Sequence, residues 1–406
     1  MGLKFFSIGI LSFFLFSCSV MSEKRYNFRK DSSRDFKSIL KKMDKEDFYD
    51  DRSTFLKFYD IGIINHYLGN YESSLKFLNR ASEVQDSLYT ISISNEAVSF
   101  VTNDNITPYR AKDYEISLLH TFSMINYLLL ERYDEAIVEY KRGEFYFLDK
   151  DINYDYGERI HYLIGGYTFL CLDDIDNSAI AIEKLLRNYD RDNLEIPKQV
   201  EEFCSFVLTS SEREESLNRY SLKPVESFPY KVIEISYFGM INLLFQEVVR
   251  GSYLENGGLI IYGSSMCEEK EFDNIVIPNM SGESSSGRTF HIKIALPSID
   301  KDRTLMSKSY FSSSLNRLAE IDLENHYDTI LIRSAIRNIA KLIVAEKTKE
   351  ELRQKNSIAN LIIDILTDVV YDISEQADIR MGIWLPAEIE IKFLDRGERG
   401  VVINRY

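Results

Sequence analysis

Apolar residues recur at every third or fourth position between Phe55 and about Ser216, which is the spacing of helices that bury one face. Pro224 and Pro229 follow this stretch, and proline ends helices because it lacks a backbone N–H and clashes with the preceding turn. We therefore expect residues 55–220 to form a domain built from helices.

Beyond residue 225 the hydrophobic positions follow a period of two in short runs, which indicates strands. Residues 231–249 are ambiguous, because β-branched residues come first and a helix-like spacing follows. We expect strands at 259–262, 274–277 and 290–296, helices at 330–355 and 358–374, and a closing hairpin of 388–394 with 400–404. The predicted fold class is α+β, with a helical repeat domain at 55–220 and a smaller mixed strand and helix domain at 225–406.

Within the helical part, three segments align with one another. Each has small residues where two helices would approach and large residues that would fill the space beside them: Gly62, Ser74, Ala136, Gly166 and Ser178 are small, and Phe58, Leu78, Tyr127, Tyr140 and Ile182 are large. These segments resemble tetratricopeptide repeats. Equating Gly62, Met124 and Gly166 gives unequal spacings, with an insertion around 85–112. A generic helical bundle is the alternative, and either arrangement would present a concave surface to another protein or peptide.

The first twenty residues carry a different signal. Lys4 precedes an uncharged run from Phe5 to Phe16, which is too short to span a bilayer but has the length of a signal-peptide core. The run ends in Leu15-Phe16-Ser17-Cys18, which resembles the lipobox of bacterial lipoproteins. The resemblance implies that residues 1–17 are removed and that Cys18 carries the acyl chains; an ordinary cleaved signal with an incidental cysteine is the alternative. For residues 18–54 a solvated charged tether is favoured over one that binds anionic headgroups, although its first half is basic.

Composition narrows the class of protein. The 406 residues are 45% hydrophobic and 28% charged, which excludes a wholly disordered chain. The net charge of −15 argues against a nucleic-acid partner, because phosphate contacts need surplus Lys and Arg. No second long apolar run occurs, so we expect a soluble body behind the anchor. Several residues with reactive side chains occur singly and are expected to be packed: Cys171, Cys204, Cys267, His66, His120 and His161.

Two patterns that could indicate a nucleotide-binding loop or a metal site are better explained as ordinary structural features. Gly282–Thr289 reads GESSSGRT and matches the phosphate-binding loop except for Arg288, but a strand-like run follows it where that loop needs a helix. Asp364, Asp368 and Asp372 fall on one face of a predicted helix, where a solvated surface is favoured over a metal site. Because no HExxH, CxxC or GxSxG motif occurs either, we expect no enzymatic activity, cofactor, metal or bound nucleotide.

Three stretches carry a more specific signal. They are Thr107-Pro108-Tyr109 through Asp113-Tyr114-Glu115 to Asn126-Tyr127 and Val138-Glu139; Arg333-Ser334-Ala335-Ile336-Arg337 with Lys341; and Glu375-Gln376-Ala377-Asp378-Ile379-Arg380 before Leu385-Pro386. Together with the order of the segments, they resemble an uncharacterised family of bacterial tetratricopeptide lipoproteins found in spirochaetes and proteobacteria. Residues 381–384 follow the family pattern only in part. The resemblance implies this fold and a location in the cell envelope, and it brings no established activity.

Gln376, Asp378 and Arg380 lie where the last long helix is predicted to end. They would be the polar site if the C-terminal domain had one. The favoured interpretation is structural: Asp378 and Arg380 would tie that helix to the strand that begins near Pro386.

The sequence therefore predicts a lipid-anchored scaffold of the bacterial cell envelope, held in the outer membrane with its body in the periplasm. Its partners would be other envelope proteins, such as components of outer-membrane or cell-wall assembly, bound through the helical repeats. We expect Tyr109, Glu115, Tyr127 and Tyr140 to contact them. Two alternatives stay open: a surface-displayed lipoprotein with an external partner, and an enzyme that acts on an envelope polymer.

Overall fold

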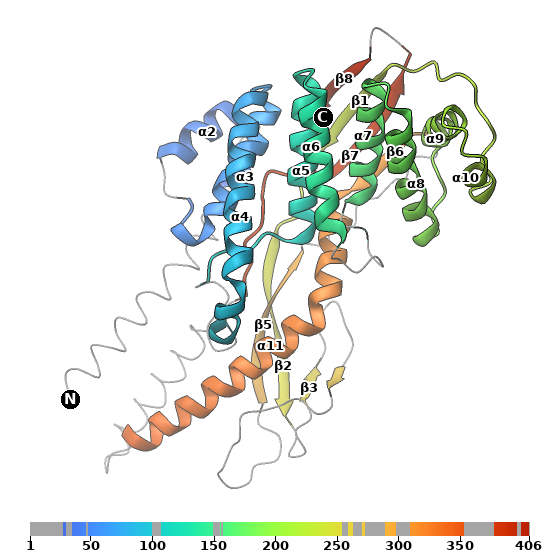
Figure 1. Ribbon diagram of the computed structural model, residues 1–406. Helices are drawn as coiled ribbons and strands as arrows, with labels where there is room; N and C mark the ends of the chain where they lie inside the picture. Colours follow the sequence, from blue (N-terminus) through green and yellow to red (C-terminus); the bar gives the residue numbers. More distant parts are fainter. Residues whose placement is uncertain are drawn as a thin grey trace.

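The computed structural model, drawn in Figure 1, describes residues 27–29, 35–45, 48–99, 107–148, 155, 157–253, 259–262, 270–272, 289–297, 309–352, 377–395 and 399–405. Helices dominate the first half and strands follow, with one long helix among them, so the α+β class is confirmed. Several predicted features fall outside the described residues: Cys18, Cys267, the strand at 274–277, Gly282–Arg288, the helix at 358–374 with its aspartates, and Gln376.

The helical part is a series of hairpins. The chain enters through α2 (Phe36–Lys45) and a 3-10 turn at Asp51–Ser53. It then pairs α3 (Thr54–Tyr67) with α4 (Tyr71–Ser99), α5 (Asp113–Leu129) with α6 (Tyr133–Leu148), α7 (Glu158–Cys171) with α8 (Ile175–Arg191), and α9 (Lys198–Ser210) with α10 (Glu214–Arg219). The last pair was not among the three repeats expected. Helix α4 also runs on to Ser99, through the first part of the predicted insertion.

The four hairpins share one turn geometry. A residue with positive φ follows each first helix: Gly69, Glu131, Asp173 and Glu212. The next residue in each turn donates its backbone N–H to the carbonyl five positions back, at 2.9–3.0 Å. In the first three turns, the positive-φ residue comes seven positions after Gly62, Met124 and Gly166. Backbone geometry therefore matches the equivalence inferred from these three positions.

Small residues let the helices of two hairpins touch. The Ser74 hydroxyl donates to the Gly62 carbonyl at 2.7 Å, and the Ser178 hydroxyl donates to the Gly166 carbonyl at 2.8 Å. A Cβ atom on Gly62 would lie 2.7 Å from the Leu78 side chain, so only glycine permits this approach. The predicted role of the small and large positions in helix contact holds for these pairs.

The described residues beyond α10 form two four-stranded sheets and one long helix. Sheet A has the order β6 (Phe311–Ser314), β7 (Glu388–Leu394), β1 (Val232–Phe238), β8 (Gly400–Arg405). Sheet B has the order β4 (Lys270–Phe272), β3 (Leu259–Tyr262), β2 (Leu244–Tyr253), β5 (Thr289–Pro297), and its pairs are antiparallel. The long helix α11 (Leu315–Leu352) packs against β5. It crosses the molecule beside sheet B in Figure 1.

Three predictions about this part need correction. Strands β7 and β8 do not form a hairpin, because β1 lies between them, antiparallel to β7 and parallel to β8. The ambiguous stretch 231–249 holds β1 and the start of β2 rather than a helix. Helix α11 begins at Leu315 instead of residue 330. The expected strands at 259–262 and 290–296 are confirmed as β3 and β5.

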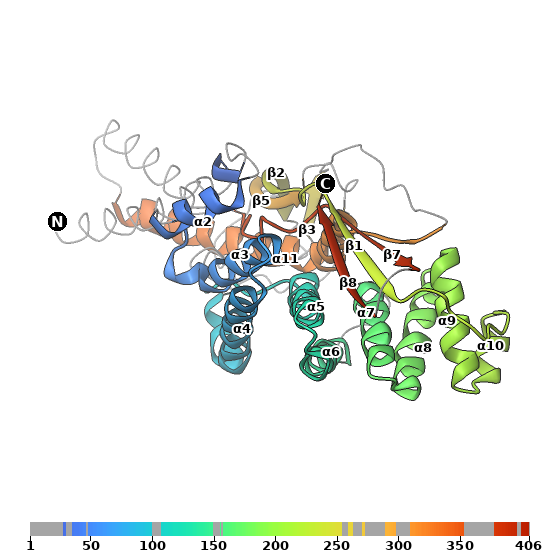
Figure 2. The ribbon, with the colours of Figure 1, turned by 90° about the horizontal axis from the view of Figure 1, so that it is seen from above.

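Sheet A covers the inner face of the hairpin array. Figure 2 shows α4, α6 and α8 on the side away from β1, β7 and β8, and the first helix of each pair between. Each first helix contacts the sheet: His66 and Phe122 meet Tyr237 of β1, the Tyr167 hydroxyl meets the backbone of Lys231 and Gly400, and the Gln199 amide pairs with both backbone groups of Phe393. The expected concave surface is therefore filled by this chain's own C-terminal part.

A buried hydrogen-bonded chain fixes how the first two hairpins meet the sheet. Asn126 donates to the Ser74 hydroxyl at 2.9 Å, so its carbonyl oxygen faces Nδ1 of His66 at 2.7 Å. Nδ1 of His66 is then the donor, and Nε2 accepts from the Tyr237 hydroxyl at 2.9 Å. This histidine is packed and fully hydrogen-bonded, as expected for a residue that occurs singly.

The segment predicted as a solvated tether is folded where the structure describes it, at 27–29 and from Asp35 onward except at 46–47. Helix α2 buries Ile39 and Met43, and Phe48 and Tyr49 are buried behind it. Side chains from this segment, the hairpins and sheet A belong to one continuous cluster of buried hydrophobic residues. The boundary expected near residue 220 separates two kinds of secondary structure, but it does not separate two hydrophobic cores.

Candidate functional site

A short irregular segment, 377–387, joins the C-terminal part to the hairpins, and two buried carboxylates hold it. Figure 1 shows this segment, in red, between α3 and α5. Glu115 of α5 accepts the Gly382 N–H at 2.7 Å on one oxygen, and the Tyr109 hydroxyl at 2.6 Å and the Lys112 N–H at 2.9 Å on the other. Asp60 of α3 accepts the Ile383 N–H at 3.0 Å. Side-chain acceptors thus replace the partners that a sheet would give this backbone.

Gly382 is required by its surroundings. A Cβ atom there would lie 2.7 Å from the ring of Tyr59, which is completely buried. Met381, Ile383 and Trp384 on either side are also buried. The stretch that only partly follows the family pattern is therefore core, packed against the hairpins.

The buried Arg380 and the half-buried Asp378 form an ionic clasp. The guanidinium donates to both oxygens of Asp378, at 2.8 and 2.7 Å, and to the Thr107 carbonyl at 3.1 Å, and it lies over the Tyr109 ring. Burial by itself would raise the pKa of the Asp378 carboxyl, but the charge and hydrogen bonds of Arg380 outweigh it and lower the pKa below its usual value. The clasp ties this segment to the loop before α5, whereas the sequence suggested the strand near Pro386.

The residues expected to contact a partner lie in different places. Tyr109 and Glu115 touch each other, are buried, and face this chain's own segment 377–387. Tyr140 is buried with its ring stacked on His161. Tyr127 is half-buried under the guanidinium of Arg132. In this structure, three of the four side chains therefore make their contacts inside the protein: Tyr109, Glu115 and Tyr140.

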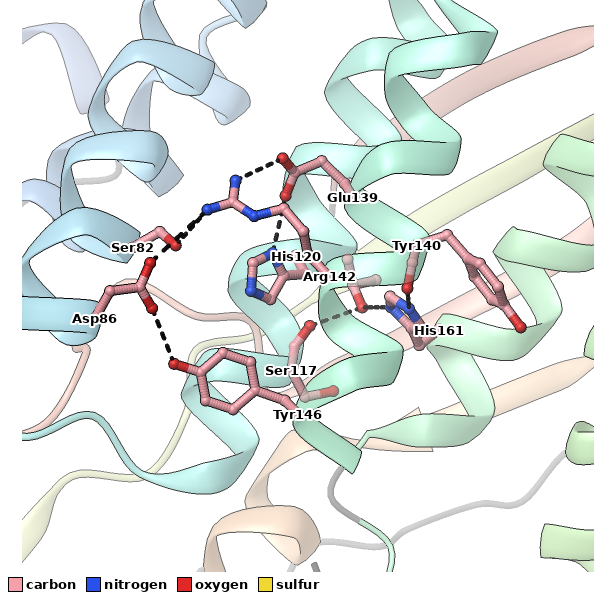
Figure 3. A network of polar contacts seen from close by, with 10 residues as sticks. Ser82, Asp86, Ser117, His120, Glu139, Tyr140, Arg142, Tyr146 and His161 are labelled. Atoms are coloured by element: carbon pink, nitrogen blue, oxygen red, sulfur yellow. Dashed lines mark hydrogen bonds and ion pairs between the residues drawn. The ribbon is translucent and has the colours of Figure 1, made fainter. Parts of the chain in front are cut away.

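A second polar cluster, drawn in Figure 3, ties three helices of the first two hairpins together. His120 contacts Glu139 at 2.8 Å, and Arg142 donates to Glu139 at 3.1 Å and to Ser82 of α4 at 3.1 Å. Burial opposes ionisation of Glu139, but His120 and Arg142 outweigh it, so the pKa of this carboxyl lies below its usual value. Asp86 extends the cluster toward Arg142. The ionised carboxylate clamps α4, α5 and α6 together.

His161 occupies the deepest part of the same region. Its Nε2 donates to the Tyr140 carbonyl at 2.9 Å, because a carbonyl can only accept, and its Nδ1 faces Thr121 at 3.1 Å. Burial lowers the pKa of His161 to about 4, so the ring is neutral at pH 7. A neutral, fully buried imidazole in this setting is a packing residue.

A third cluster stands at the start of α7. Arg159 bridges Asp155 at 2.5 Å and Asp192 at 2.7 Å, and Arg191 reaches Glu158 at 3.1 Å. Burial, and next the Asp155 carboxylate, raises the pKa of Glu158 to about 7, although Arg191 opposes the shift. This raised pKa follows from burial and from the neighbouring carboxylates of Asp155 and Asp192, which outweigh Arg191.

Within the described ranges, no group of three or more His, Cys, Asp or Glu side chains is arranged to hold a metal ion, and no described helix is long and apolar enough to cross a membrane. Burial raises the pKa of the half-buried Cys171 thiol to about 11, which makes it a poor nucleophile.

Comparison with known proteins adds no family. No family model, curated protein or solved structure matches the chain.

Asp60 is the important residue that the sequence analysis passed over. It sits in α3 between Tyr59 and Ile63, which are completely buried. A carboxylate on the apolar side of a helix needs a buried partner, so its position in the hydrophobic pattern was a usable signal. Which backbone group it would meet was not visible, because Ile383 lies 323 residues away.

The first prediction concerns Glu115. Replacing it in Glu115→Ala leaves two buried donors, Tyr109 and Gly382, without an acceptor, at about 1–3 kcal/mol each, so the free energy of unfolding should fall by at least ~2 kcal/mol. Glu115→Gln keeps one acceptor oxygen and should lose about half as much. Urea unfolding measures the loss, and amide hydrogen exchange should quicken at Gly382. Glu135→Ala, at an exposed ion pair on α6, is the control and should cost less than about 1 kcal/mol. Equal losses for both positions would contradict this account.

The second prediction concerns Glu158. Its pKa is raised from the ordinary 4.5 to about 7 by folding, so its contribution to stability is complete below pH 4.5 and is lost as the pH rises through 7. Glu158→Gln mimics the protonated form. Its free energy of unfolding should equal that of the unsubstituted protein near pH 4.5 and exceed it by on the order of 3 kcal/mol at pH 8.

Urea unfolding across this pH range measures the difference. His161 acts in the opposite direction, since a lowered pKa costs stability as the pH falls, but both proteins share it and the comparison removes it. The exposed Glu201→Gln on α9 is the control, with an unchanged profile. Parallel profiles for Glu158→Gln and the unsubstituted protein would show that Glu158 ionises normally.

Proposed function

We propose that the protein is a lipid-anchored adaptor of the bacterial cell envelope that binds partner proteins through its array of hairpins. The lipobox-like Leu15–Cys18, behind an apolar run of signal-peptide length, supports the anchor. The shared turn geometry and the bonds from Ser74 to Gly62 and from Ser178 to Gly166 support a tetratricopeptide-like array. Arrays of this type serve as binding surfaces because their stacked helices extend one continuous face. The proposal places the body in the periplasm, anchored to the outer membrane, and gives it no enzymatic role.

The inner face of the array is not the free one. Sheet A and segment 377–387 cover the first helices of the hairpins, and their removal would expose the core that all parts share. Helices α4, α6 and α8 lie on the side away from the sheet, as Figure 2 shows. A partner would therefore dock on this outer side, and the buried Tyr109, Glu115 and Tyr140 would support the array from within.

Exposed apolar side chains on α6 carry this proposal. Val138 is 54% exposed and Phe145 is 69% exposed, and their seven-residue spacing places them on the same side of the helix. Ile180 of α8 is 39% exposed, and an ion pair between Lys184 and Glu144 holds α8 beside α6. Exposed apolar residues that share one side of a helix mark a surface on which a partner can dock, and an aromatic ring such as Phe145 is the type of residue that often anchors an interface.

The third prediction tests the anchor. Cys18→Ser in the full chain should abolish acylation and signal removal, because the thiol is the atom that would carry the lipid. Mass spectrometry of the purified protein and partition into a detergent phase measure the outcome. Cys171→Ser is the matched control and should still be acylated. A chain whose Cys18→Ser variant keeps the lipid mass, or an unsubstituted chain without it, would refute the anchor.

The fourth prediction tests the binding face. Val138→Glu combined with Phe145→Glu should lower the capture of envelope partners at least tenfold, because apolar contacts at the centre of an interface would be replaced by charges. The measurement is crosslinking in cells, followed by quantitative mass spectrometry of the proteins joined to this chain. Circular dichroism should show an unchanged fold, since both positions are exposed.

Val402→Glu is the control, because Val402 is exposed on β8, outside the hairpin array. A partner counts only if the α6 variant loses it and the β8 variant keeps it. Equal capture by all three proteins would contradict the proposed face. Protease treatment of intact cells separates a periplasmic body, which survives, from a surface-displayed one.

A further inference from the structure

Helix α2 has two chemically distinct sides. Phe36, Ile39, Leu40 and Met43 follow the spacing of one helical face, and they pack into the core cluster. Phe36 lies 6.2 Å from Trp384 and 5.1 Å from Tyr67, measured between ring centroids. The apolar side of the helix therefore packs against the body, and the opposite side faces outward.

The outward side is basic. Lys37, Lys41 and Lys42 are exposed, and Lys37 and Lys41 are one turn apart. The charge stands out because the remainder of the protein is acidic. From Cys18 to Lys45 the sequence has nine Lys and Arg against four Asp and Glu, whereas the chain as a whole carries −15.

The position of α2 relative to the proposed anchor follows from the chain itself. Phe28 stacks on Phe48 with ring centroids 4.3 Å apart, and Arg29 donates to the Ile241 carbonyl, so the chain joins the body here. Phe28 is ten residues after Cys18, and ten residues span at most about 36 Å. Nζ of Lys42 lies 5.9 Å from the Phe28 ring. The basic side of α2 therefore stands next to the point where a short tether would pull on the body.

We infer that the basic side of α2 is a membrane-docking surface that binds anionic lipid headgroups. The inference rests on the proposed anchor at Cys18 for its geometry, since the tether brings the surface to the bilayer. Each lysine near an anionic bilayer contributes about 1 kcal/mol, and the effect falls off within a Debye length of about 8 Å. The acidic remainder of the body would be repelled by the same lipids, so docking through α2 orients the hairpin array away from the membrane.

The test removes the lipid so that only the surface is measured. The mature chain, residues 18–406 with Cys18→Ser, keeps every described residue and carries no acyl chain. It is sedimented with vesicles of phosphatidylcholine alone and with vesicles that contain 30% phosphatidylglycerol. We expect binding to the anionic vesicles only, lost when the salt concentration is raised. Replacing Lys37, Lys41 and Lys42 together with Gln should weaken this binding about 100-fold, because three charges contribute.

A matched variant keeps the test specific. Lys76, Lys198 and Lys223 are exposed on other elements, and their joint replacement by Gln changes the net charge equally. This variant should bind as the unsubstituted chain does. Equal weakening by both variants, binding to both kinds of vesicle, or no binding at low salt would each overturn the inference. Because the chain is not acylated, those results leave the anchor untouched, and the anchor is judged separately by the mass of the Cys18→Ser protein.

Discussion

The fold depends on hydrogen bonds between polar side chains of the inner helices and backbone groups of non-helical segments that lie far away in the sequence. Asp60 and Glu115 accept the N–H groups of Ile383 and Gly382, and Gln199 pairs with Phe393. Each of these backbone groups is buried, and an unpaired buried group costs about 1–3 kcal/mol. The hydrophobic core can close around segment 377–387 only because these acceptors are in place.

This arrangement changes what the hairpin array can do. In an open array a peptide could bind to the inner helices, but here sheet A covers them. The array is consequently stiffened from within, by the clasp of Arg380 on Asp378 and by the Glu139 cluster of Figure 3. A rigid outer face with an exposed Phe145 suits an interface in which a preformed surface meets its partner with little loss of conformational freedom.

The features that sequence reasoning predicted well are local. The equivalence of Gly62, Met124 and Gly166 depends on spacing within one hairpin, and the turn geometry repeats with it. The pairing of β1 between β7 and β8 could not be foreseen, because it joins residues at least 150 positions apart that share only alternating apolar character. For a related reason, the sequence predicted that Glu115 contacts a partner, whereas in the structure it accepts a backbone N–H of this chain. A carboxylate looks the same in a sequence whether it faces water or the amide of Gly382, and the difference lies in a residue 267 positions away. Phe28 and Phe36 were assigned to a tether because their burial depends on Trp384, far along the chain.

Because these contacts join residues far apart in the sequence, they also determine when the chain can complete its fold. Ile383 meets Asp60 across 323 residues, and Arg29 meets Ile241 across 212. Hairpins such as α7 with α8 can form as soon as their own residues are available, whereas the inner face stays open until segment 377–387, β7 and β8 are available. A chain that is threaded across a membrane from its N-terminus would thus expose apolar helix faces for the whole of its passage. A change in segment 377–387 would therefore be felt at α3, because Ile383 pairs there with Asp60.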